Sequence, residues 1–88
     1  MDQPRLPERL TLDDAENVLR DLRRAASGQG DVTLDAGALR HFDSSAVAVL
    51  LELRRELQRE GRALHVAHWP ERLRDLIQVY GVGDLLPA

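Results

Sequence analysis

The sequence predicts an α/β fold in which three helices cover a small sheet of about four strands. Short segments with alternating apolar residues, which are typical of strands, occur at residues 31–35 and 63–68. Longer segments with apolar residues at helical spacing occupy residues 11–26, 44–60 and 70–80. Strands that alternate with helices argue for a sheet covered by helices, with right-handed connections between successive parallel strands.

Size and composition narrow the class of protein. With 88 residues the chain is expected to form a single domain, residues 1–88, whose core is built from Leu, Val and Ala because only three residues are aromatic. The absence of Cys excludes disulfides and thiolate metal sites. The formal net charge of −3 argues against a nucleic-acid-binding module. No apolar run approaches the ~20 residues of a membrane span. Residues 1–4 contain no basic segment followed by an apolar one, so we do not expect them to begin a signal peptide. We therefore expect a cytoplasmic protein that meets a membrane only through a partner.

The N-terminal part should hold a short edge strand and the first helix. Residues 5–10 contain Leu6 and Leu10 around Pro7, which an edge strand tolerates. Thr11 to Asp14 fit a capping box, so the helix is expected to start at Thr11. Residues 27–30 contain two glycines and should end it. The expected apolar face of this helix is Ala15, Val18, Leu19, Leu22, Ala25 and Ala26.

The remaining elements follow in order. After the strand at 31–35, residues 36–43 are expected to form a loop, and a helix should run from Ser44 to Glu60 and stop at Gly61. Its expected apolar stripe is Ala46, Val47, Val49, Leu50, Leu53 and Leu57. Pro70 suits the first residue of the third helix, and Gly81 should end it. The expected stripe of that helix is Leu73, Leu76, Ile77 and Tyr80.

Patterns for catalysis and for cofactors are weak, so we expect no catalytic residue, no metal site and no cofactor. His65 and His68 are three residues apart on a strand and should lie on opposite faces, which does not favour a shared metal. His41 lies close to Ser44 in sequence, but the chain has no nucleophile-elbow motif. It also lacks a Walker pattern and a dinucleotide fingerprint. A small enzyme remains a distant alternative.

The segment Asp43-Ser44-Ser45 allows two interpretations. Asp and Ser are preferred helix N-caps, because their oxygens accept hydrogen bonds from free backbone N–H groups. A helix N-terminus also favours a phosphate, so Ser44 could be a contact residue or a phosphorylated switch. Local chemistry does not choose between these roles.

Three segments together resemble the STAS domain family: Val32 to Asp35, Leu39 to Phe42, and Asp43 to Leu50. In that family a strand leads to a loop of the form Asp-Ser/Thr-Ser/Ala/Gly-Gly-Leu, which opens the second helix. The resemblance extends from about Leu6 to Pro87. This chain has Ala46 where the family usually has Gly, and it has room for one strand where the family usually starts with a hairpin.

Two branches of the family resemble the chain. In anti-sigma-factor antagonists the Ser that matches Ser44 is phosphorylated by a partner kinase, which releases the partner. The MlaB branch comprises cytoplasmic subunits of the Mla phospholipid-transport ABC complex of Gram-negative bacteria. The stretch from Leu76 to Pro87 looks like the ending of that branch, which we favour.

The resemblance to the MlaB branch implies a non-catalytic protein, held at the inner membrane by its partner. It would bind an MlaF-like ABC ATPase subunit, in one complex with permease and substrate-binding subunits, and support assembly or activity in maintaining outer-membrane lipid asymmetry. The expected partner-binding residues are Asp43, Ser44, Ser45, Val47 and Tyr80. Val47 is expected to be exposed at the centre of the interface. Tyr80, or Trp69, would serve as an aromatic anchor, although Tyr80 could instead pack in the core.

Overall fold

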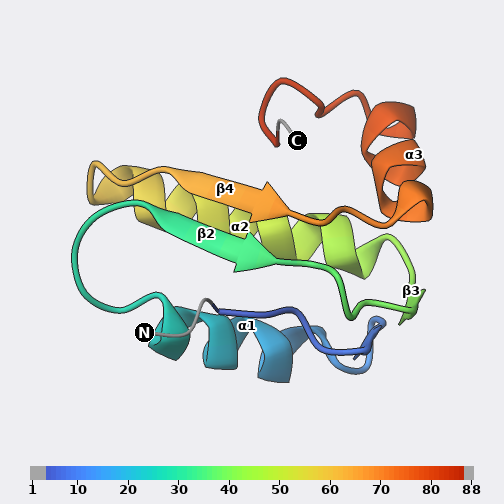
Figure 1. The fold of residues 1–88 in the computed structure, drawn as a ribbon, viewed down its shortest axis with the longest axis horizontal. Coiled ribbons are helices and arrows are strands. Elements are labelled where there is room, and N and C mark those ends of the chain that lie inside the picture. Colours follow the sequence, from blue (N-terminus) through green and yellow to red (C-terminus); the bar gives the residue numbers. More distant parts are fainter. Residues whose placement is uncertain (1–3, 87–88) are drawn as a thin grey trace.

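The computed structural model, which describes residues 4–86, contains three helices and four strands (Figure 1). This arrangement confirms the predicted α/β class. In chain order the elements are β1 (Arg9–Leu10), α1 (Ala15–Ala25), β2 (Val32–Asp35), β3 (His41–Phe42), α2 (Ser45–Arg59), β4 (Leu64–Ala67) and α3 (Glu71–Val79).

The strands form two parallel pairs. β2 pairs with β4 from Val32 opposite Leu64 to Asp35 opposite Ala67, and β1 pairs with β3 with Leu10 opposite Phe42. Along β2 and β4 buried residues alternate with more exposed ones. The pair therefore has one face toward the core and one toward solvent.

The N-terminal segment connects the two strand pairs. The N–H of Leu6 donates to the carbonyl of Asp35 at 2.8 Å, and the N–H of Asp35 donates to the carbonyl of Pro4 at 2.9 Å. After Pro7, which has no N–H to donate, the chain continues into β1 beside β3. The edge strand expected at residues 5–10 is thus reduced to β1 and a bridge at Arg5.

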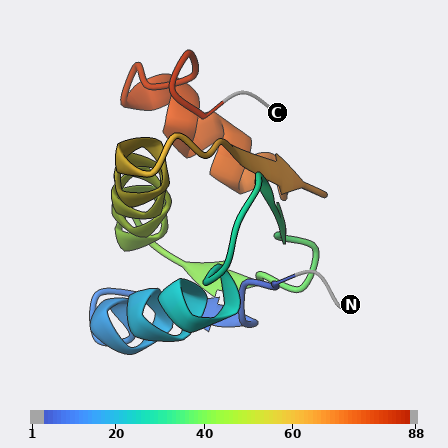
Figure 2. The same cartoon turned by 90° about the vertical axis from the view of Figure 1, so that its left-hand side faces the viewer.

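The helices α1 and α2 lie on the same side of the β2–β4 pair (Figure 2). Leu34 of β2, Leu50 of α2 and Leu73 of α3 are inaccessible to solvent and belong to one aliphatic core. Among residues 4–86 this core contains no buried polar or charged residue. Stability therefore rests mainly on burial of aliphatic side chains.

Two helices end in the way that their glycines predict. Gly61 after α2 and Gly81 after α3 have φ of 71° and 69°. The N–H of Gly61 donates to the carbonyl of Gln58, and that of Arg62 to the carbonyl of Leu57, both at 2.9 Å. These two bonds define a Schellman motif.

Three helix expectations need correction. α1 begins at Ala15 rather than Thr11, because residues 11–14 form a turn in which Asp14 accepts the N–H and the hydroxyl of Thr11, both at 2.9 Å. Ala25, which was expected on the apolar face, is exposed, whereas Leu22 and Ala26 are buried. Pro70, with ψ of 142°, precedes α3 as its N-cap instead of being its first residue.

Residues 36–43 are not wholly a loop. They include the two-residue strand β3, and Ala36 and Leu39 are buried beside it. A strand this short has no detectable sequence periodicity and exists through its pairing with β1. Its position matters because Asp43 follows it directly.

Truncation of a core leucine should destabilise the protein much more than truncation of a surface leucine. Leu50→Ala removes a side chain with 0% exposure, and we expect the free energy of unfolding to fall by about 3 kcal/mol. Leu12 is 75% exposed, so Leu12→Ala should change it by less than about 0.5 kcal/mol. Urea denaturation followed by circular dichroism measures both, and similar losses would contradict the assignment of the core.

Candidate functional site

Asp43 organises the start of α2. Its Oδ1 accepts the N–H of Ser45 at 2.8 Å, and its backbone carbonyl accepts the N–H of Ala46 at 3.0 Å. Its Oδ2 accepts the N–H of Leu12, in the turn before α1, at 3.2 Å. The hydrogen bond from the N–H of Ser45, with a smaller effect from Leu12, holds the pKa of Asp43 below its usual value. The carboxylate therefore stabilises the loop in its ionised form.

Ser44 is left free by this arrangement. Its backbone is already helical, with φ of −61° and ψ of −16°, and its side chain makes no capping hydrogen bond. Asp43 therefore performs the capping role that the sequence offered to both residues. The exposed hydroxyl of Ser44 is available to another molecule, whereas Ser45 is half-buried.

Two hollows meet at Ser44. The first has a volume of about 520 Å³ and the second of about 380 Å³. Ser44 and Tyr80 line both of them, so the two hollows form one continuous region that we call the Ser44 surface. The first hollow is also lined by Phe42, Asp43, Arg72, Asp75, Leu76 and Val79, and the second by Val47, Ala48, Leu51 and Val82.

Two exposed apolar side chains of α3 and its C-terminal end line this surface. Among residues 4–86 the large apolar side chains that are exposed are Leu12, Val79, Tyr80 and Leu85. Val79 is 78% exposed and Tyr80 is 53% exposed, and both line the first hollow. Leu85 lines a different pocket, and Leu12 is tied to this region only by its backbone N–H, which donates to Asp43. Exposed apolar groups that concentrate in one place are typical of a protein-binding surface.

The structure brings together four of the five residues predicted to bind a partner: Asp43, Ser44, Val47 and Tyr80. Ser45 is adjacent but lines neither hollow. The expectation that Val47 is exposed is wrong, since Val47 is only 3% exposed and packs into the core. The exposed apolar residue on this turn of α2 is Ala48.

Sequence reasoning missed Leu12, Arg72 and Val79. Val79 could have been found, because it is apolar yet lies off the buried stripe of α3. Leu12 was hidden by the expected helix start, since a leucine three residues before Ala15 would belong to the buried face of a longer helix. No sequence pattern indicates Arg72, because its position depends on a contact with Phe42. The guanidinium carbon of Arg72 lies 5.0 Å from the centre of the Phe42 ring.

A family model supplies the independent comparison. The model described as "Mlab, STAS domain" matches residues 5–87. The chain belongs to this family. No curated protein matches the chain. STAS domains are generally non-catalytic, and membership is consistent with either an accessory subunit or an anti-sigma-factor antagonist.

Among the described residues that line the two hollows there is no histidine, although His41 directly precedes Phe42 in β3. His68, with φ of 59°, places its Nδ1 3.1 Å from Oδ1 of Asp35, which also accepts the N–H of Gly37 at 2.8 Å. The Gly37 N–H, followed by His68, lowers the pKa of Asp35. Nε2 of His65 lies 3.8 Å from Oδ2 of Asp31. Within residues 4–86 no group of three or more His, Asp or Glu side chains could hold a metal ion.

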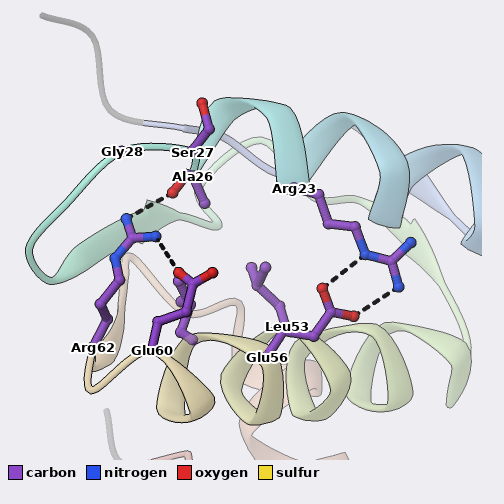
Figure 3. Close-up of a pocket in the computed structure, with 9 residues that line it drawn as sticks. Arg23, Ala26, Ser27, Gly28, Leu53, Glu56, Glu60 and Arg62 are labelled. Atoms are coloured by element: carbon purple, nitrogen blue, oxygen red, sulfur yellow. Dashed lines mark hydrogen bonds and ion pairs between the residues drawn. The ribbon is translucent and has the colours of Figure 1, made fainter.

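Another pocket, of about 300 Å³, lies between the ends of α1 and α2 and is bounded by ion pairs (Figure 3). Arg23 of α1 donates two hydrogen bonds to Glu56 of α2, at 2.8 and 2.7 Å, which lowers the pKa of Glu56. Arg62 donates to the carbonyls of Ala26 and Gly30, both at 2.6 Å. The charged side chains that line this pocket thus hold α1, α2 and the α1–β2 connection together.

No helix among residues 4–86 has the length and apolar character needed to cross a membrane.

Substitution of Asp43 should have a pH-dependent effect. Because its pKa is lower in the folded state, its contribution to stability is present above the unfolded pKa of about 4 and is lost as the pH falls through the folded pKa. We expect Asp43→Asn to lower the Tm at neutral pH and to differ less from wild type in acid. Asp13→Asn, at an exposed position on the turn before α1, is the control. An equal difference in Tm at both pH values would contradict this role of the carboxylate.

Loss of the Arg62 side chain should loosen the α1–β2 connection. The side chain is 10% exposed and satisfies two backbone carbonyls with charge-assisted bonds. We expect Arg62→Ala to reduce the free energy of unfolding by about 2 kcal/mol. Arg54→Ala, which removes a surface hydrogen bond to Gln58, should reduce the free energy of unfolding by less than half as much. Urea denaturation measures both losses. Equal costs would show that the two backbone bonds add nothing.

Proposed function

We propose that this STAS domain is a non-catalytic accessory subunit that binds the ATPase of a phospholipid-transport ABC complex. In that role it would work in the cytoplasm, held at the inner membrane by the ATPase, which acts with its permease and substrate-binding subunits. It would support the assembly or activity of a complex that maintains outer-membrane lipid asymmetry. The match of residues 5–87 to the MlaB-type model favours this branch of the family.

The observation that carries the proposal is the position of Ser44. Its hydroxyl is exposed and free of any capping bond, and it lies between two hollows that share Tyr80. The second hollow is lined mainly by apolar side chains, and the first adds polar and charged ones. An apolar centre with an aromatic residue and a polar margin suits protein docking.

An alternative function is that of an anti-sigma-factor antagonist. The free hydroxyl at the N-terminus of α2 favours it, since a kinase could reach Ser44 without breaking a cap. A phosphate there would be stabilised by the helix N-terminus and would change the charge of the docking surface.

The test is a pull-down from a Gram-negative lysate with the wild type, Ser44→Arg and Ser44→Asp. We expect the wild type to recover an ABC ATPase with its membrane subunits, and both variants to lose it while they keep the wild-type circular dichroism spectrum. An added charged group at Ser44 would occupy or repel the docking surface. Ser27→Arg is the matched control, because Ser27 is exposed but lines neither hollow.

Three outcomes separate the alternatives. Recovery of the ATPase by the wild type and by Ser27→Arg alone supports the transporter function. Recovery of a kinase of the histidine-kinase-like class, with phosphoserine at Ser44 by mass spectrometry, supports the antagonist. Full recovery of the same partner by both Ser44 variants would rule out the Ser44 surface as the docking site.

A further inference from the structure

Two charged side chains of α3 face the first hollow and form no ion pair with another residue that the structure describes. Arg72 and Asp75 both line it, and both are exposed. Neither forms an ion pair with any residue between 4 and 86, although other charged residues on this protein do. They are three residues apart, so they project from the same side of the helix, yet they do not pair with each other.

Arg72 is held in place by an aromatic ring instead of a carboxylate. Its guanidinium carbon lies 5.0 Å from the centre of the Phe42 ring, which is in the range of a cation–π contact. Phe42 is buried and directly precedes Asp43. Stacking leaves the N–H groups at the edge of the guanidinium free to donate. The contact therefore presents an oriented, unneutralised cation next to Ser44.

The other carboxylate in the hollow is already engaged. Asp43 accepts hydrogen bonds from the backbone N–H groups of Ser45 and Leu12. Asp75 accepts no such bond from the part of the chain that the structure describes, so its carboxylate remains available in the hollow. With respect to residues 4–86, the hollow thus offers a cation, Arg72, and an anion, Asp75, that are not neutralised by an ion pair and follow a fixed order along α3.

We propose that Arg72 and Asp75 determine which partner docks, by binding a segment that presents a carboxylate to Arg72 and a Lys or Arg to Asp75. An apolar side chain of the same segment occupies the second hollow, against Ala48, Leu51 and Tyr80. This inference rests on the proposed function, and the partner segment belongs to the ABC ATPase. The basis of the proposal is charge complementarity: the carboxylate of the segment would pair with Arg72, and its Lys or Arg would pair with Asp75.

A fixed order of charges gives specificity. A segment with the same residues in the reverse order would place like charges together, and such a juxtaposition disfavours a wrong partner. The apolar contact in the second hollow would supply affinity but little discrimination. Selection between related ATPases would then depend on the two charges of α3.

The experiment measures the affinity of the purified ATPase, recovered with the wild type, for variants of this chain by biolayer interferometry. We expect Arg72→Glu and Asp75→Arg each to weaken binding by about tenfold or more. Exchange of the two charges, Arg72→Asp with Asp75→Arg, keeps the net charge and should weaken binding further. Arg74→Glu is the matched control, because Arg74 lies on α3 but outside both hollows, and it should change the affinity less than about threefold.

Arg72→Gln and Asp75→Asn complete the set, because they remove the charges with little change in shape. Circular dichroism checks the fold of every variant. Wild-type affinity of folded Arg72→Glu and Asp75→Arg, or an equal loss in Arg74→Glu, would overturn this inference while the proposed function stands. A wild type that binds no ABC ATPase would overturn the proposed function and this inference with it.

Discussion

The carboxylate of Asp43 joins two segments of the chain that are 31 residues apart. One oxygen caps the start of α2 and the other holds the turn before α1. These bonds fix the loop between β3 and α2 relative to α1. Two features of the Ser44 surface depend on this loop, because Phe42 supports Arg72 on one side of Asp43 and Ser44 lies on the other.

Capping by Asp43 also separates structural from functional roles. A serine that caps a helix has its oxygen occupied by backbone N–H groups, and its modification would disturb the helix. Here the aspartate takes that role, and the hydroxyl of Ser44 is not needed to hold α2. Changes at Ser44 can therefore alter the surface without altering the fold. Both candidate functions, the accessory subunit and the anti-sigma-factor antagonist, require this.

The sequence predicts the parts of the fold that have local signals. β2 and β4 follow from alternation, and α2 and α3 from helical spacing with glycine at their ends. β3 could not be predicted, since two residues carry no periodicity and depend on pairing with β1. At the candidate site, Asp43 and Ser44 follow from motif position. The burial of Val47 and the stacking of Arg72 on Phe42 depend on how α2, α3 and β3 pack, which sequence patterns do not report.

The composition of the Ser44 surface bears on the kind of association it supports. A small domain has limited apolar surface to bury, so an apolar side chain that stays exposed does not contribute its burial to the stability of the monomer. This protein leaves Val79 and Tyr80 exposed, although Tyr80 is one of only three aromatic residues. It combines them with the charges of Arg72 and Asp75, which form no ion pair within the described range 4–86. Obligate interfaces are more uniformly apolar, whereas a mixed surface remains compatible with water when the partner is absent. The mixed character of the surface thus fits the proposed role, in which the domain folds alone and associates reversibly with its partner.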